Sequence, residues 1–148
     1  MKHFKRLFAL FIIMGMVYFT LEGLWRGWTN IIMLPVGGMC ALLIGLLNER
    51  PRFIKLKIWQ QCLIGTAIIL SVEFISGCIV NLWLGLNIWD YSTIPFNVLG
   101  QVCLPYGLLW FTLCPFAIWL DDWLRWRLYK ENTHYPVYEN YIDLITSK

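Results

Sequence analysis

Four long apolar segments, joined by short polar connections, dominate the pattern of the chain. They cover about residues 7–24, 31–47, 58–86 and 96–120. A bilayer core of about 30 Å is crossed by about 20 residues of α-helix, so the first and fourth segments have the length of a membrane span. The second segment is short, and the third is long enough to tilt or to continue into an outer loop. The pattern predicts an all-α integral membrane four-helix bundle that forms a single domain over residues 1–148.

The composition agrees with this class. Of the 148 residues, 59% are hydrophobic and only 14% are charged, whereas a soluble domain of this length needs a far more charged surface. The nine tryptophans suit a protein bordered by two membrane interfaces. The two histidines, His3 and His134, lie at opposite ends of the chain, so no metal site is expected. We expect the five cysteines to pack as small apolar side chains: Cys40, Cys62, Cys78, Cys103 and Cys114.

The basic residues are distributed unevenly along this pattern. Only Arg26 lies on the side of the first and third connections. The positive-inside rule assigns the opposite, basic side to the cytoplasm. We therefore expect a multi-pass protein of the cell membrane with both termini in the cytoplasm. Its first segment is expected to stay as an uncleaved span, because "TLEGLWRGW" offers no cleavage site of small residues. The basic side holds eleven of the twelve: Lys2, Lys5, Arg6, Arg50, Arg52, Lys55, Lys57, Arg125, Arg127, Lys130 and Lys148.

The residues after the fourth segment, 121–148, have a different character. In "WLDDWLRWRLYKE", tryptophan and leucine recur at helical spacing, and Asp121 precedes Arg125 by four residues. This pattern favours a cytoplasmic juxtamembrane helix along the inner membrane surface, or an aromatic belt with basic anchors. The tail from Asn132 is polar, rich in tyrosine and without a strong helical period.

The two halves of the chain resemble each other weakly. "TLEGLWRG" resembles "SVEFISG", which matches Glu22 with Glu73, and "LPVGG" resembles "IPFNVLG", which matches Pro35 with Pro95. A duplication would produce two parallel helix–loop–helix repeats, related by an axis along the membrane normal. Matches this short also arise by chance in apolar chains, so both readings stay open.

Glu73 is an ionisable residue inside the third apolar segment, far in sequence from any basic residue. An ionised side chain deep in a bilayer is costly, so its neighbours are expected to be polar. A stripe of small residues four apart is typical of a helix-packing seam, whereas the carboxylate favours a functional site. On a helix, five residues share the face of this carboxylate: Gly65, Ile69, Glu73, Gly77 and Asn81.

A second carboxylate, Glu22, lies at a similar depth in the first segment, and Arg26 follows it by four residues. This order favours a helical ion pair. Two interpretations remain open. In the structural one, Glu22 and Arg26 pair at the outer interface, and a hydrogen-bonded Glu73 locks helices together. In the functional one, Glu22, Arg26, Glu73 and Asn81 share a polar pocket that opens outward.

The stretch "IWDYSTIPFNVLGQVCLPY" adds polar residues to this candidate binding pocket. We expect Asp90 or Ser92 to form an Asx-type turn with the backbone groups ahead of it. The predicted binding residues are Glu22, Arg26, Glu73, Asn81, Asp90, Ser92, Asn97 and Gln101. The predicted helix-packing residues are Gly65, Gly77 and Gly100.

Prolines suggest how the fourth helix is built. Pro95 fits the first turn of a helix, which would leave free N–H groups facing the outer side. Asn97 and Gln101 would then share one helical face, and Pro105 would kink the span beside them. Broken helices at membrane depth are tolerated where they line a cavity, as in transporter binding sites.

These motifs carry a resemblance to a known family. Glu73-x-x-x-Gly77-x-x-x-Asn81, followed by Trp89-Asp90-Tyr91-Ser92 and Pro95-x-Asn97-x-x-Gly100-Gln101, resembles the putative ABC-transporter type IV (CmpB-like) family of small multi-span proteins. The similar stretch covers about residues 71–110, and the first half matches only in its multi-span character. The resemblance implies a permease-like integral membrane protein and adds little about the substrate.

Three classes of function remain open. The first is transport, by a permease-like protein or transporter subunit with an outward-facing polar pocket. Four spans are few for a complete pathway, so a homo-oligomer or a partner membrane subunit is expected. No P-loop motif GxxxxGK[ST] occurs, so any ATPase would be a separate chain. The second class is a membrane assembly or regulatory subunit without transport.

The third class is an intramembrane enzyme. Ser76, Ser92 or Cys78 would be the nucleophile, and Glu73 with Asp90 would be the acid and base. Neither HExxH nor GxSxG occurs in the chain, which argues against the familiar hydrolase sites. No cofactor and no nucleic-acid partner is expected, and the lipid bilayer is the expected surroundings of the protein.

Overall fold

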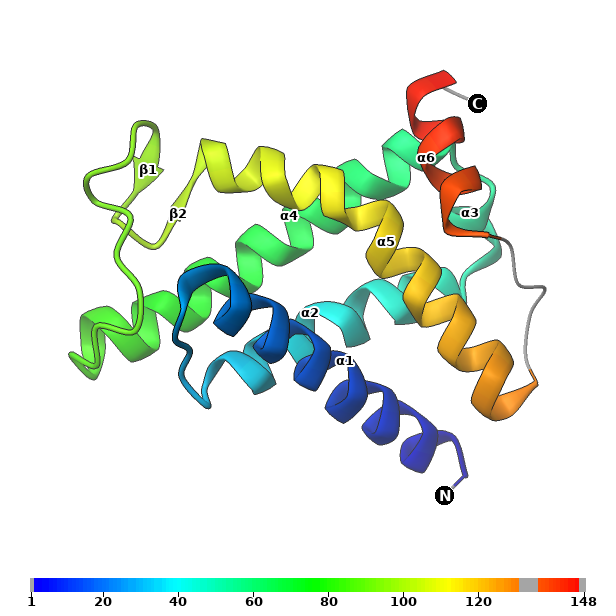
Figure 1. Cartoon of the computed structure of the whole chain (residues 1–148), viewed down its shortest axis with the longest axis horizontal. Coiled ribbons are helices and arrows are strands. Elements are labelled where there is room, and N and C mark those ends of the chain that lie inside the picture. Colours follow the sequence, from blue (N-terminus) through cyan, green and yellow to red (C-terminus); the bar gives the residue numbers. More distant parts are fainter. Residues whose placement is uncertain (1, 131–135, 147–148) are drawn as a thin grey trace.

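The computed structural model describes residues 2–130 and 136–146. His134 and Lys148 therefore lie outside the described residues, as does the beginning of the tail. The helices and strands are, in chain order, α1 (Lys2–Arg26), α2 (Met33–Asn48), α3 (Pro51–Ile54), α4 (Ile58–Gly77), the π-helix η1 (Cys78–Trp83), β1 (Asn97–Val98), β2 (Val102–Cys103), α5 (Leu104–Tyr129) and α6 (Val137–Thr146) (Figure 1).

Among the described residues, three helices are long and apolar enough to cross a membrane. They are α1, α4 with its continuation η1, and α5, whereas α2 is shorter, at 16 residues. Large apolar side chains such as Phe4, Leu63 and Leu108 point outward and are more than half exposed. Such surfaces suit lipid rather than water. The fold is therefore all-α and of membrane type, with α2 shorter than the usual span.

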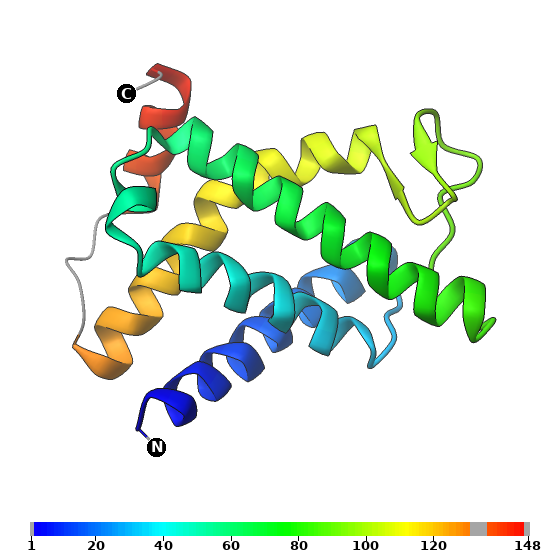
Figure 2. The same ribbon diagram turned by 180° about the vertical axis from the view of Figure 1, so that it is seen from behind.

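Close approach of backbones joins α1 and α2 into an antiparallel pair. A Cβ atom on Gly15 would lie 2.5 Å from the backbone oxygen of Leu34, and one on Gly38 would lie 2.7 Å from that of Phe11. Only glycine leaves room for this contact. Seen from behind, α4 lies in front with α2 alongside it, and α5 crosses behind α4 (Figure 2).

The fourth apolar segment is not a helix from residue 96. Asn97 pairs with Cys103 and Val98 with Val102 in a short antiparallel hairpin, and α5 begins only at Leu104. The chain turns there because Phe96, Leu99 and Gly100 adopt positive φ values, which end any helical path.

The prolines accordingly have other places than predicted. Pro95 precedes the hairpin instead of opening a helix, and Pro105 lies in the first turn of α5, where a missing N–H costs little. Pro115 is the proline inside α5, and the helix bends near the middle of its length in Figure 1. The predicted kink at Pro105 is therefore wrong.

The structure aligns the two halves of the chain differently from the weak resemblance in their sequences. Pro35 lies in the first turn of α2 within "LPVG", and Pro105 lies in the first turn of α5 within "LPYG". The residue equivalent to Pro35 is thus Pro105 and not Pro95. Glu22 and Glu73 each stand four residues before the last residue of their α-helices, at Arg26 and Gly77.

The residues after the fourth segment do not form a separate surface helix. Helix α5 continues without interruption to Tyr129, and Asp121 and Arg125 are buried at 3% and 1% exposure. The tail then forms α6, which was not predicted from the sequence. Two side chains of α6 donate to backbone oxygens on either side of the bend in α5: Asn140 Nδ2 to the Pro115 oxygen at 3.2 Å, and the Tyr141 hydroxyl to the Thr112 oxygen at 3.1 Å.

An ion-pair network gathers three basic stretches at one end of the molecule, which we call the basic end. Glu49, just after α2, binds Arg6 of α1 at 2.7 Å and Arg125 of α5 at 2.5 Å. Arg125 also binds Asp121 at 2.7 Å. The hairpin and the C-terminal end of α1 lie at the opposite end, which we call the hairpin end (Figure 1). The predicted segregation of positive charge is therefore present in the fold.

Candidate functional site

A pocket of about 480 Å³ opens near the hairpin end. We call it the hairpin-side pocket. Residues of α1, α2, the Trp89–Ile94 loop and the start of α5 line it, among them Glu22, Arg26, Asp90, Tyr91 and Tyr106. Three of the predicted binding residues therefore line one pocket.

The predicted ion pair is formed on one wall of this pocket. Arg26 Nη1 donates to Glu22 Oε1 at 2.5 Å, and the Thr29 hydroxyl donates to the other carboxylate oxygen. Arg26 also donates to the Ile88 oxygen at 3.1 Å and lies 4.3 Å from the centre of the Trp28 ring. Both charges thus have partners, and the pair ties α1 to the loop that precedes the hairpin.

The predicted Asx turn is also formed. Asp90 Oδ1 accepts a hydrogen bond from the Ser92 backbone N–H at 2.8 Å, and Oδ2 accepts one from the Ser92 hydroxyl at 3.0 Å. Tyr91 stacks on Tyr106 with ring centres 4.6 Å apart. Burial raises the pKa of the Tyr91 hydroxyl above its ordinary value, and the nearby Glu73 carboxylate raises it further. This wall of the pocket therefore carries the Asp90 carboxylate and a tyrosine hydroxyl that burial keeps neutral.

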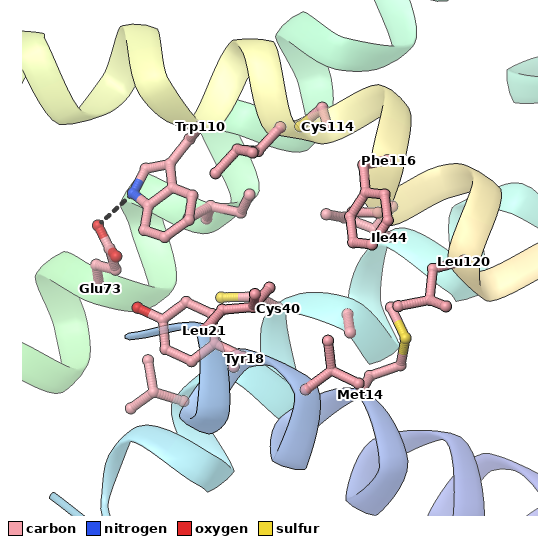
Figure 3. A pocket seen from close by; sticks show the side chains of 17 residues that line it. Met14, Tyr18, Leu21, Cys40, Ile44, Glu73, Trp110, Cys114, Phe116 and Leu120 are labelled. Atoms are coloured by element: carbon pink, nitrogen blue, oxygen red, sulfur yellow. Dashed lines mark hydrogen bonds between the residues drawn. The ribbon is translucent and has the colours of Figure 1, made fainter. Parts of the chain in front are cut away.

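Glu73 does not lie in this pocket but in a smaller cavity behind it, of about 110 Å³. We call this the Glu73 cavity. It lies among α1, α2, α4 and α5, and Figure 3 shows Glu73, Tyr18, Cys40 and Trp110 around it. Glu73 is 3% exposed, and its Oε2 accepts a hydrogen bond from Trp110 Nε1 at 3.1 Å. The carboxylate therefore faces protein and cavity, not lipid.

The two spaces adjoin. Tyr18, Leu21, Trp110 and Leu113 line both of them, and the rings of Tyr18 and Trp110 lie 5.7 Å apart, centre to centre. An aromatic pair thus separates the ion pair and Asp90 on one side from the Glu73 carboxylate on the other.

Asn81 and Gln101 line neither space. Asn81 Nδ2 donates to Gln101 Oε1 at 2.8 Å, and Asn81 Oδ1 accepts from the Ile88 N–H at 2.7 Å. The Trp89 indole N–H donates to the backbone oxygen of Gln101 at 3.0 Å. Asn81 lies in η1, and π-helical turns are frequent where a side chain must be re-aimed. These residues fasten the hairpin to the end of α4, and the structure does not bring them to the hairpin-side pocket with Glu22, Arg26 and Asp90.

Asn97 and Gly100 serve the hairpin itself. Asn97 Nδ2 donates to the backbone oxygens of Ser92 and Ile94, and its Oδ1 accepts from the Gly100 N–H at 3.0 Å. Gly100 has a φ of +68°, which glycine adopts without strain, so it is a turn residue and not the predicted helix-packing residue. Because the helix begins later, Asn97 and Gln101 do not share a helical face.

The predicted stripe on α4 is real, since Gly65, Ile69, Glu73, Gly77 and Asn81 are all buried. A Cβ on Gly65 would lie 3.0 Å from Cys114 Sγ of α5. The stripe is therefore both a packing seam and the support of the carboxylate.

Replacing Gly77 with alanine is expected to destabilise the protein by about 1–3 kcal/mol, the usual cost of overpacking. The added Cβ would lie 2.5 Å from Gln101 Oε1 and 3.1 Å from the Trp89 ring, and both partners are held by hydrogen bonds. The midpoint of unfolding in lipid nanodiscs measures this effect. Ser71→Ala, at an exposed position on the same helix, is the control, and equal midpoints for the two variants would contradict the packing account.

Several residues that line the two cavities or the buried ion-pair network were not predicted from the sequence. Trp110 lies in the middle of an apolar segment rather than near its ends, and this position is a signal that it does not belong to an interfacial belt. Tyr18 and Tyr106 also lie inside apolar segments, where a hydroxyl group is costly unless it has a polar neighbour. The burial of Arg125 could not be predicted from the sequence, because its partner Glu49 is distant in sequence.

Comparison with known proteins agrees with the resemblance noted in the sequence. The sequence profile of a family described as Putative ABC-transporter type IV matches residues 7–138. Comparisons with curated proteins and with solved structures find no match. Since the matched region runs from the first apolar helix to the beginning of the last helix, the chain belongs to the Putative ABC-transporter type IV family.

Proposed function

We propose that the protein is a permease-like membrane subunit whose hairpin-side pocket receives a solute from outside the cell. The observation that supports this proposal best is that the hairpin-side pocket and the Glu73 cavity adjoin each other. A pocket with Glu22, Arg26 and Asp90 on its walls adjoins a second cavity that Glu73 lines, and Tyr18 and Trp110 line both. A polar entrance, an aromatic constriction and a buried carboxylate are the parts expected of a solute path.

The direction of the path follows from the distribution of charge. Arg6, Glu49 and Arg125 join three helices at the basic end, and most of the lysines and arginines cluster there. By the positive-inside rule this end and both termini face the cytoplasm of a cell membrane. The hairpin-side pocket then faces outward.

Partner chains complete the proposal. The two cavities reach from the hairpin end as far as Glu73 and its surroundings, and the Asp121–Arg125 pair lies buried between them and the basic end, so passage through the membrane requires rearrangement or a neighbouring subunit. A second copy or a different membrane subunit would supply the remaining wall. The energy of ATP would come from a separate chain, since the P-loop motif is absent from this sequence.

Uptake into right-side-out membrane vesicles tests the proposal, because such vesicles retain partner subunits. Vesicles with and without the chain are incubated with a mixture of small metabolites, and the solutes taken up are identified by mass spectrometry. We expect at least one solute to enter only where the chain is present. Identical uptake profiles would contradict the proposed function.

Two neighbouring leucines of α5 provide a matched pair of variants. Leu109 lines the hairpin-side pocket, whereas Leu108 is 61% exposed on the outer surface of the helix. Leu109→Trp fills the pocket and is expected to reduce uptake to the level of vesicles without the chain. Leu108→Trp adds the same bulk toward lipid and is expected to leave uptake unchanged.

A further inference from the structure

The Glu73 cavity differs in chemistry from the pocket in front of it. Its walls consist of aliphatic, aromatic and cysteine side chains, and Glu73 is the one charged residue among the described residues that line it. No lysine or arginine side chain reaches the carboxylate within that set. A counter-charge for an ionised Glu73 would therefore have to enter the cavity from outside.

The Glu73 carboxylate can accept more hydrogen bonds than it receives. Trp110 Nε1 donates to Oε2, and among the described residues this is the one hydrogen bond that the Glu73 carboxylate receives. An ionised carboxylate has about four lone-pair sites, so one indole donor leaves most of them unused. Since Glu73 is 3% exposed and aimed into the cavity, these sites are presented to whatever occupies it (Figure 3).

The surroundings select among possible occupants. Tyr18, Trp110 and Phe116 place aromatic rings around the cavity, and ring faces attract organic cations. A hard metal cation needs about six oxygen ligands, and the cavity walls offer the carboxylate and the Tyr18 hydroxyl. An anion would be repelled by the carboxylate. An ammonium group with an apolar body satisfies both the charge and the walls.

We propose that the Glu73 cavity binds the ammonium end of a small organic cation, whose remaining atoms extend into the hairpin-side pocket. The volume fits this role: about 110 Å³ holds a few heavy atoms, since an engineered cavity of about 150 Å³ holds benzene. The inference rests on the proposed function, because the cation reaches the cavity through the hairpin-side pocket.

Binding of three matched probes to the full chain in nanodiscs tests the inference. Isobutylammonium, isobutanol and isobutyrate share an apolar body and differ in charge, and saturation-transfer NMR measures their dissociation constants. We expect isobutylammonium to bind about tenfold more tightly than isobutanol, as one charge-assisted hydrogen bond provides. Isobutyrate is expected not to bind. In Glu73→Gln the preference for the cation over the alcohol should disappear, while Glu139→Gln, a carboxylate of α6 far from the cavity, should retain it.

A second variant keeps the test decisive if Glu73→Gln fails to fold. Cys40→Leu narrows the cavity without touching the carboxylate, and it is expected to abolish binding of isobutylammonium. Equal binding of the ammonium and the alcohol, or a cation preference that persists in the folded Glu73→Gln variant, would overturn the inference. Failure of isobutylammonium to bind at all, with Glu73 only gaining or losing a proton, would also overturn the inference. Any of these results, combined with solute uptake that Leu109→Trp abolishes, would leave the proposed function standing.

Discussion

Replacing Glu73 with glutamine is expected to lower solute uptake by about 10- to 100-fold while the protein still inserts and folds. Glutamine has the same length as glutamate, and its amide oxygen can still accept the hydrogen bond from Trp110 Nε1. Only the charge is lost, and hydrogen bonds to a charged group contribute about 1.5–3 kcal/mol, which is roughly that change in affinity. Initial uptake rates in membrane vesicles, normalised to the amount of folded protein, measure the effect.

Two further variants separate charge from structure at this position. Glu73→Asp keeps the charge on a shorter side chain and should retain part of the uptake. Trp110→Phe removes the indole donor and should leave the carboxylate free to bind a cation. If Glu73→Gln supports uptake at the normal rate, the charge of Glu73 has no part in uptake and the side chain serves only to pair helices.

Replacing Arg125 with alanine is expected to destabilise the protein by about 3–5 kcal/mol, the cost of breaking a buried ion pair from one side. The side chain of Arg125 is 2% exposed and that of its partner Asp121 is 4% exposed, so the aspartate would be left as an unpaired charge. Glu49 is 32% exposed and can turn toward water, which limits the loss. The midpoint of unfolding in nanodiscs measures the effect.

The control is Arg127→Ala, an exposed basic residue on the same helix, which is expected to leave the midpoint unchanged. In the double variant Asp121→Asn with Arg125→Gln, the buried charges are replaced by neutral side chains of similar size. This variant should recover part of the lost stability. Equal stability of Arg125→Ala and Arg127→Ala would mean that the network at the basic end is not buried as described.

Features that depend on neighbours in sequence could be predicted from the sequence. The stripe from Gly65 to Asn81 follows helical spacing, and the Glu22–Arg26 pair needs only one helix turn. Among the described residues, hydropathy located the three helices that are long and apolar enough to cross a membrane, but not the bounds of α5. The start of α5 could not be predicted in this way, because an apolar hairpin and an apolar helix have the same hydropathy, and the positive φ of Phe96 and Leu99 is not marked by glycine.

Features that depend on tertiary contacts were missed. Helix α6 is strongly amphipathic in its own sequence, so its helical period was present and was overlooked, and hydrogen bonds to the backbone of α5 near Pro115 hold it in place. The Asn81–Gln101 bond joins residues 20 positions apart through a π-helical turn, so both looked like pocket residues. Trp110 was one of nine tryptophans, and only the fold selects it as the partner of Glu73.

Thiol labelling of the neighbouring residues 108 and 109 tests most directly whether water reaches the hairpin-side pocket from outside. Single cysteines at the two positions, in a chain whose five native cysteines are replaced, are exposed to a membrane-impermeant thiol reagent in right-side-out vesicles. We predict that Leu109→Cys reacts rapidly from outside and that Leu108→Cys, which faces lipid, does not. Reaction of Leu108→Cys but not of Leu109→Cys, or reaction of Leu109→Cys only after the inner face is exposed, would contradict an outward-opening pocket.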